Sequence, residues 1–216
     1  DLARAVWIVG AAGQAALSLA VLSNWIGHRS FQTIHVSPAW FIPAVGNVVA
    51  PVAGVPLGFV ELSWIFFAAG LIFWLVLLNL VMNRLVFHDP LPGRMVPTLA
   101  ILVAPPAVAA LAWLQLNGGA LDPFARILHG TAAVFLALAL TQARLMMSQP
   151  FALSWWAISF PVAAFAVATL RVGALSGSAM HLAAGHAAVV AVLVIVAALG
   201  WRTARAIARH EICRPE

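Results

Sequence analysis

The chain has 216 residues, of which 64% are apolar and only 8% are charged. A soluble domain carries about 25% charged residues, so this composition excludes water as the main solvent and predicts an integral membrane protein. The formal net charge is +5, but the arginines are scattered singly and form no basic face with interleaved aromatic residues, which argues against a nucleic-acid partner.

Seven apolar segments follow one another along the chain, and each is near the length of about 20 residues that crosses a bilayer. In chain order they are residues 2–22, 39–57, 61–83, 96–115, 124–143, 151–170 and 180–200. Short polar stretches separate them, and nothing in the sequence resembles a water-soluble domain. We therefore expect an all-α membrane protein with one transmembrane domain over residues 1–216.

Arginine is distributed unevenly between alternate loops. One side receives the larger group, Arg29, Arg84, Arg94, Arg144, Arg202, Arg205, Arg209 and Arg214, and the other side receives only Arg4, Arg126 and Arg171. Short loops that face the cytoplasm retain positive charge, so the C-terminus is predicted to be cytoplasmic. Seven spans then place residue 1 outside, and an odd number of preceding spans would return the start of the protein to the cytoplasm.

Proline falls only in alternate segments. The second holds Pro43, Pro51 and Pro56, the fourth holds Pro97, Pro105 and Pro106, and the sixth holds Pro161. Proline inside a helix removes a backbone hydrogen bond, and in hydrocarbon the freed carbonyl needs protein or water as its partner. The pattern predicts an inner ring of kinked helices around a central path, each followed by a straight outer helix. Proline is also common in membrane helices generally, so chance alternation is the alternative.

Four motifs in these segments match a known pattern. They are Pro38-Ala39-Trp40-Phe41-Ile42-Pro43 with Gly46, Pro51 and Gly54 after it, Leu71-Ile72-Phe73-Trp74, Ala104-Pro105-Pro106-Ala107-Val108-Ala109, and Phe151-Ala152-Leu153-Ser154-Trp155-Trp156-Ala157-Ile158-Ser159-Phe160-Pro161. Together they resemble the tellurite-resistance and C4-dicarboxylate transporter family, which includes the plant guard-cell slow anion channels. The last motif is the most specific, because two tryptophans before a proline-broken turn rarely recur by accident.

The resemblance implies a bundle of ten spans, with kinked inner helices around a pore and outer helices around them. It also implies a homotrimer with one pore in each subunit, a bacterial inner-membrane location, and no enzymatic activity, cofactor or metal. The present segments correspond to the C-terminal part of such a bundle, and about three N-terminal spans are expected to precede them. The expected partners are small anions and membrane lipid.

Phe160 is the residue that the resemblance maps onto the pore-occluding phenylalanine of the family. An aromatic ring across a narrow apolar path excludes water until the ring moves. Phe160 also precedes Pro161, and the residue before a proline is disfavoured in helical geometry, which would aim the ring at the axis. The pore helices are predicted to kink at Pro43, Pro51, Pro105, Pro106 and Pro161. Further candidates for lining the path are Phe41, Gly46, Asn47, Gly54, Ser154 and Ser159.

Each of these residues also has a structural interpretation. A phenylalanine packs in a core, and a single polar side chain in a span usually makes a hydrogen bond between helices. The three proline-containing segments carry no Asp, Glu, Lys or Arg, so a cation path with acidic rings finds no support. The leading interpretation is a passive channel for small inorganic anions through a phenylalanine-gated pore.

Two alternatives remain at this point. Within the family, the first alternative is a secondary transporter of a dicarboxylate or a tellurium oxyanion, with or without coupling to protons. A dianion would require a cationic residue deep in the path. More remotely, the chain is a haem-binding membrane subunit that uses His129, His181 or His186. His181 and His186 are five residues apart, so they do not share one face of a helix.

Overall fold

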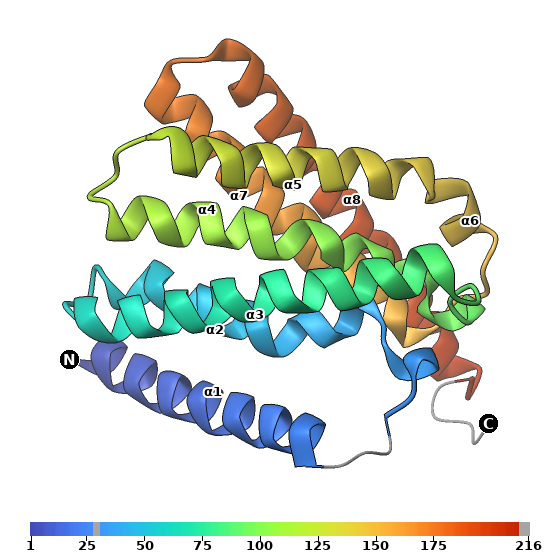
Figure 1. Ribbon diagram of the computed structural model, residues 1–216. Helices are drawn as coiled ribbons and strands as arrows, with labels where there is room; N and C mark the ends of the chain where they lie inside the picture. The colour runs from blue at the N-terminus through green and yellow to red at the C-terminus, as the bar shows by residue number, and fades with distance from the viewer. Residues whose placement is uncertain (28–30, 212–216) are drawn as a thin grey trace.

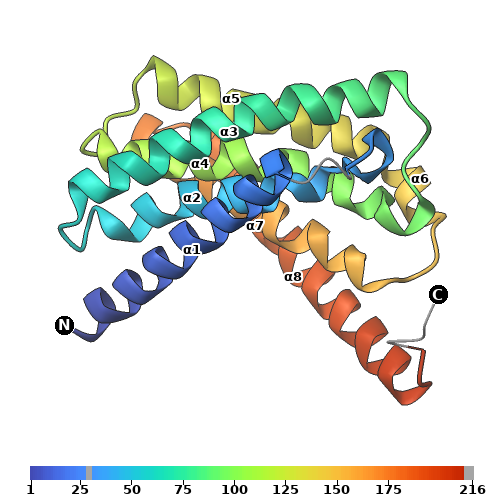
Figure 2. The ribbon, with the colours of Figure 1, turned by 60° about the horizontal axis from the view of Figure 1, so that its bottom comes forward.

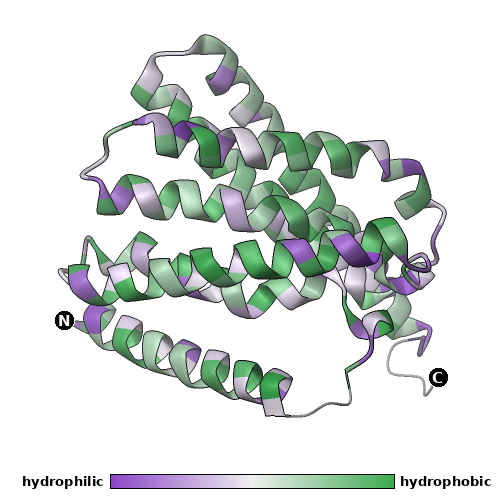
Figure 3. Cartoon of the chain, viewed as in Figure 1, coloured by the Kyte–Doolittle hydropathy of each residue, from purple (hydrophilic) through white to green (hydrophobic). Residues whose placement is uncertain are grey.

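The computed structural model describes residues 1–27 and 31–211, and this part is helical without a strand (Figure 1). Within it, six helical stretches are long and apolar enough to cross a bilayer. They are α1 (Leu2–Gly27), α3 (Val60–Phe87), residues 93–116, α5 (Pro123–Thr141), residues 153–176 and α8 (Ala179–Ala208). Apolar residues cover most of their length (Figure 3), which confirms the all-α membrane fold. Arg29 and Arg214 lie outside the described residues.

The second predicted segment, residues 39–57, forms a shorter element than expected. A 3-10 helix, η2 (Pro38–Trp40), leads into α2 (Phe41–Gly54), and these residues are too few for a full span by length. The reason is the tight connection that follows. Gly58 has a φ of +92°, which favours glycine, and α3 begins two residues later. The last residues of the predicted segment are therefore used for the turn.

The two other proline-containing segments also begin as 3-10 helices and continue as α-helices. They are η3 (Gly93–Val103) with α4 (Ala104–Leu116), and η4 (Leu153–Ile158) with α7 (Ser159–Ser176). A 3-10 run of 11 residues is unusual, since such runs rarely exceed three or four residues. Two short helices, η1 (Thr33–His35) and α6 (Ala143–Met147), lie in connections.

The inner elements form a row with α4 in its middle. Helix α4 packs against both α2 and α7, whereas α3 packs on α2, α5 on α4 and α8 on α7. Each proline-containing element is thus paired with the straight helix that follows it in sequence. At the two ends of the row, α1 and α8 diverge from one another (Figure 2).

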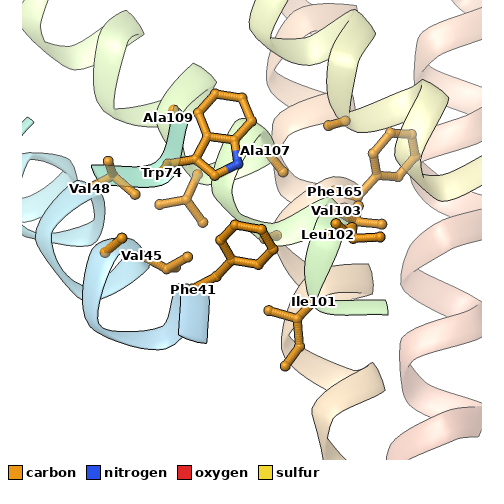
Figure 4. Packing of buried hydrophobic residues seen from close by; sticks show 14 of the residues in the cluster. Phe41, Val45, Val48, Trp74, Ile101, Leu102, Val103, Ala107, Ala109 and Phe165 are labelled. Atoms are coloured by element: carbon orange, nitrogen blue, oxygen red, sulfur yellow. The ribbon is translucent and has the colours of Figure 1, made fainter. Parts of the chain in front are cut away.

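Burial separates the two sets of helices. In the most apolar window of residues 93–116, 83% of residues are buried, whereas the corresponding share is 11% in α1 and α8 and 28% in α3 and α5. The share is 44% in residues 153–176, and seven of the 14 residues of α2 are buried. The proline-containing elements are therefore the more buried set, as predicted, whereas a central path between them stays a prediction. Buried side chains of α2, α3, η3, α4 and α7 meet in one cluster (Figure 4), which includes Phe41, Val45, Val48, Trp74, Ile101 and Phe165.

Candidate functional site

A cavity of about 370 Å³ lies where the three inner elements change from 3-10 to α-helix. Its walls come from α1, the start of α2, the η3–α4 junction and the η4–α7 junction. The lining residues are Gln14, Ile42, Val45, Gly46, Val49, Ile101, Ala104, Ala157, Phe160 and Pro161. None of them is charged, and Gln14 is the only polar side chain in this lining. The cavity is therefore a nearly apolar space beside the packed core.

Phe160 is the largest side chain in this lining. It is 49% exposed, whereas the next residue, Pro161, is buried. Ala157, Phe160 and Pro161 are spaced i, i+3 and i+4, so they share one helical face, and that face meets the cavity. The ring is therefore free of tight packing on one side, which an occluding ring requires. Its role as a gate stays a prediction.

The backbone at Phe160 differs from our expectation. Phe160 lies inside α7, so the prediction that Pro161 forces it out of helical geometry is wrong. The two preceding residues already have helical dihedrals, with φ −79° and ψ −30° at Ile158 and φ −64° and ψ −55° at Ser159. Because η4 runs directly into α7, the helix overcomes the usual preference of a residue before proline. The position of Phe160 within the helical turn therefore directs its ring, and no break in the helix is involved.

The prolines lie near the same junctions. Pro43, Pro105, Pro106 and Pro161 all fall within the first four residues of α2, α4 or α7, a region where proline costs least because the first amides have no partner within the α-helix. Pro51 lies inside α2. Pro51, Pro105, Pro106 and Pro161 are buried, and Pro43 is half-buried. Their action as kinks of a conducting path stays a prediction.

Of the six further candidates, the structure places Gly46 on this cavity and the other five elsewhere. Phe41 is fully buried in the core (Figure 4). Asn47 is buried and turns toward α1, where its Nδ2 donates to Ser18 Oγ at 3.0 Å. Gly54 packs at the far end of α2 against Trp7.

The two serine candidates donate hydrogen bonds to backbone carbonyl groups. Ser154 Oγ donates to the carbonyl oxygen of Arg94, which ties η4 to η3. Ser159 Oγ donates to the carbonyl oxygen of Trp156 at 2.7 Å, within its own helical turn. The Ser154 bond matches the structural interpretation, a hydrogen bond between helices, whereas the Ser159 bond stays within one helical turn.

Gln14 of α1 was not predicted, because α1 has no proline and was assigned to the outer set. Its Nε2 donates to Ser18 Oγ at 2.9 Å and to the carbonyl oxygen of Pro43 at 3.0 Å. A β-carbon on Gly46 would collide with the Gln14 amide, so glycine is what allows the amide to lie there. The polar pair Gln14 and Ser18, four residues apart in an apolar span, was the signal available in the sequence.

Arg84 is the second residue that sequence reasoning missed, because it was counted as a loop charge. It lies in the last turn of α3 and is only 1% exposed. Its Nη1 donates to the carbonyl oxygen of Asp89, and its Nε has no partner in the described part of the chain. A cation at the C-terminal end of a helix is favoured by the helix dipole. Arg84 is therefore a buried positive charge that bonds the backbone carbonyl of Asp89.

Trp155 and Trp156, the tryptophan pair of the most specific motif, connect η4 to α8. Trp156 Nε1 donates to Thr203 Oγ1 at 3.0 Å. The Arg202 guanidinium lies over the rings of Phe151 and Trp155, 5.0 Å and 5.1 Å from their centroids. Such cation–π contacts stabilise by about 0.5–1 kcal/mol at exposed sites. The motif therefore has a packing role at the end of the bundle opposite to Arg171.

The histidines considered as haem ligands make contacts with other side chains. His129 Nε2 lies 3.0 Å from Thr169 Oγ1, and its ring stacks on Phe165. The ring centroids of His129 and His181 are 5.5 Å apart, and the two rings are tilted by 47°. His186 is exposed and contacts the carbonyl oxygen of Leu182 in its own helix. Within residues 1–27 and 31–211, no three metal-ligating side chains come together.

Comparison with known proteins identifies relatives of the chain. It is 29% identical over 182 residues to an uncharacterized transporter of Methanocaldococcus jannaschii, covering 74% of this chain and 53% of that protein. It is 30% identical over 160 residues to the tellurite resistance protein TehA homolog of Haemophilus influenzae, covering 73% and 48%. It is 29% identical over 165 residues to an S-type anion channel of Arabidopsis thaliana, covering 75% and 26%.

The chain thus spans about half the length, or less, of these relatives. The sequence model of the family described as voltage-dependent anion channel matches residues 1–204, which is almost the whole chain. The family comprises channels and transporters and not enzymes. Its match agrees with the multi-pass helical fold, and the chain therefore belongs to the voltage-dependent anion channel family.

Proposed function

We propose that this protein is a passive channel for small inorganic anions and that the Phe160 ring closes its path. The observation that carries the proposal is the half-exposed Phe160 ring in an apolar cavity walled by all three inner elements. A ring in a narrow apolar constriction excludes water, so ions pass only after it moves. The names of the plant relatives, which describe anion channels, support the same substrate class.

Charge favours anions over cations in this proposal. The lining of the cavity contains no acidic side chain that would bind a cation. The end of the bundle at which α8 finishes carries six of the described arginines. They are Arg84, Arg94, Arg144, Arg202, Arg205 and Arg209. Asp89 and Glu211 lie at the same end, so arginine outnumbers acidic residues there and the net charge is positive. A net positive surface raises the local concentration of anions. Anions would therefore be concentrated at this arginine-rich end of the bundle.

The test is anion flux into liposomes that contain the full-length protein. Phe160→Ala should increase chloride and nitrate flux, because the small side chain leaves the path open. Phe87→Ala is the matched control, since Phe87 is 75% exposed at the end of α3 and lies away from the cavity. A folded Phe160→Ala variant with unchanged flux would refute the gate.

A coupled transporter of dicarboxylate or tellurium oxyanion is the second candidate. A dianion needs a fixed positive charge inside the protein, and Arg84 is one that the sequence did not reveal. Arg84 is not part of the lining around Phe160, so the channel remains the leading proposal. Flux of malate or tellurite that depends on a proton gradient would favour the transporter, whereas gradient-independent chloride flux would favour the channel.

We further propose the membrane location, the orientation and the oligomeric state of the protein. The protein lies in the bacterial inner membrane with a cytoplasmic C-terminus, because the arginine-rich end of the bundle then faces the cytoplasm. About three further spans complete a ten-helix bundle, and three such subunits form a homotrimer with one pore each. A C-terminal fusion to a reporter that is active only in the cytoplasm tests the orientation, and the native mass of the full-length protein tests the trimer.

A further inference from the structure

A second cavity, of about 550 Å³, lies on the other side of η3. Gly93, Val96, Leu99 and Leu102 of η3 line it. These residues are three apart, and a 3-10 helix has three residues per turn, so they form one edge of η3. Ile101, on a different edge, lines the Phe160 cavity. The long 3-10 helix is therefore a wall between two separate cavities.

The remaining walls come from helices that belong to the outer set. They contribute Met82 and Leu85 of α3, Pro90 and Leu91 of the following loop, Leu138, Ala139 and Gln142 at the end of α5, and Leu145 and Gln149 around α6. Apart from the two glutamines, these side chains are apolar. Leu138 and Leu145 of this lining are 40% and 47% exposed, so the space is open to the surroundings of the bundle and accessible to a ligand. Its size and apolar lining match the usual range for ligand pockets.

The polar groups of this cavity lie at one end. Gln142 follows the last residue of α5, and Gln149 follows α6. A β-carbon on Gly93 would collide with the Gln149 amide, so this glutamine is held against the start of η3. The start of η3 and the loop before it belong to the arginine-rich end of the bundle. The cavity therefore has an apolar body and an amide-lined mouth at that end.

Helix α6 has the composition of a segment at a membrane surface. Leu145 is 47% exposed and Met147 is 67% exposed, while Arg144 between Gln142 and Leu145 is exposed. Apolar side chains with a neighbouring arginine are typical of segments that lie in the lipid headgroup region. Arg144 itself does not line the cavity, but it adds a positive charge to the short segment whose Gln142, Leu145 and Gln149 do.

We propose that this cavity binds an acyl chain of an anionic phospholipid, with the phosphate near Arg144 and the amides of Gln142 and Gln149. The apolar walls exclude a water-soluble metabolite, and a cavity of this kind does not hold ordered water because water needs polar partners. Basic pockets at the cytoplasmic ends of transmembrane helices are common sites for anionic headgroups. A bound chain would contact the same 3-10 helix that lines the Phe160 cavity.

The test is lipid retention by the purified full-length protein, measured by native mass spectrometry after addition of phosphatidylglycerol, phosphatidylcholine or oleate. Ala139→Phe fills the cavity and should reduce phosphatidylglycerol retention by about tenfold, the effect of losing roughly two buried methylene groups. Val134→Phe is the matched control, because Val134 is on the same helix, 67% exposed and not part of the lining. It should retain the lipid as the unmodified protein does.

The headgroup is tested by Arg144→Gln, with Arg205→Gln as its control. Arg144→Gln should lower phosphatidylglycerol retention by about fivefold, the contribution of one arginine near an anionic surface, and remove the preference over phosphatidylcholine. Equal retention by Ala139→Phe and the unmodified protein, no preference for phosphatidylglycerol, or binding of oleate alone would each overturn the proposal. Should Ala139→Phe fail to fold, Leu138→Trp fills the same cavity. Retention is measured without flux, so it is independent of the proposed channel activity.

Discussion

The side-chain amide of Gln14 donates a hydrogen bond to the carbonyl oxygen of Pro43, 3.0 Å away, and so joins α1 to α2. The Asn47 amide donates to the same carbonyl at 2.9 Å, and both amides also reach Ser18 Oγ. Two donors therefore share two acceptors at this helix contact, where Trp7 Nε1 also donates to the carbonyl oxygen of Ala50 at 3.0 Å. In a bilayer, polar groups of this kind need protein partners because water is absent. This network fixes α1, an outer helix, beside the cavity that contains Phe160.

Replacing Asn47 by Leu should destabilise the protein by about 1–2 kcal/mol, because buried Asn47 loses two bonds and Ser18 and Pro43 each lose a donor. Thermal unfolding in detergent measures the change. The matched control is Asn79→Leu, because Asn79 is exposed and bonds only the carbonyl of Leu75 in its own helix. If both variants lost the same stability, the network would have no special role.

Gly185 should not tolerate a side chain. A β-carbon there would lie 2.7 Å from the Leu170 side chain and 3.0 Å from its backbone nitrogen, so α7 and α8 would have to separate. We expect Gly185→Ala to cost about 1–3 kcal/mol, as overpacking usually does. Gly200→Ala, in the same helix with no atom near the new β-carbon, should be neutral or slightly stabilising. Denaturant titration of both variants makes the comparison, and equal stabilities would contradict close packing at Gly185.

The membrane spans followed from the sequence because hydrocarbon imposes a length and an apolar composition on every helix that crosses it. The interior position of α2, α4 and α7 followed from the proline pattern, although only Pro51 lies far enough inside its α-helix to free a carbonyl group. The 3-10 geometry of η3 did not follow, since 3-10 and α-helices have the same apolar composition. The sequence also did not show which side of α2 each residue faces. Asn47 and Gly46 are neighbours in the sequence, yet they face α1 and the cavity respectively.

Long-range placement accounts for the site residues that sequence reasoning missed. Arg84 follows an apolar run and has the sequence context of a loop arginine, and only tertiary packing shows that it is 1% exposed. Gln14 is polar in a helix without proline, and its position beside Phe160 depends on how α1 crosses α2. Both cases depend on contacts between segments far apart in the chain, which no local pattern encodes.

Thr169→Val should destabilise the contact between α5 and α7. Valine has nearly the shape of threonine, but it leaves the ring nitrogen of buried His129 without its partner at 3.0 Å. An unsatisfied buried polar group costs about 1–3 kcal/mol. Thr131→Val is the control, because Thr131 is exposed and bonds only the carbonyl of Ile127 in its own helix. Thermal unfolding of the two variants should differ, and a stable Thr169→Val variant would show that the bond contributes little.

Arg84 provides a test of the role of buried charge in anion movement. Arg84→Gln removes the charge but keeps an amide donor for the Asp89 carbonyl. If the positive potential of Arg84 draws anions into the bundle, chloride flux into liposomes should fall by about tenfold, the lower end of typical electrostatic focusing. Arg84→Lys keeps the charge and should recover part of the flux, although lysine cannot reproduce the planar guanidinium.

The control for Arg84 is Arg126→Gln, because Arg126 is exposed at the other end of the bundle and its charge is screened by salt. Its flux should stay near that of the unmodified protein. Stability has to be measured in parallel, since removal of a buried charge without a carboxylate partner need not destabilise the bundle. A folded Arg84→Gln variant with full flux would show that Arg84 only caps α3. Reduced flux that Arg84→Lys recovers would instead show that the charge acts on the anion, because both variants remove the same guanidinium contacts.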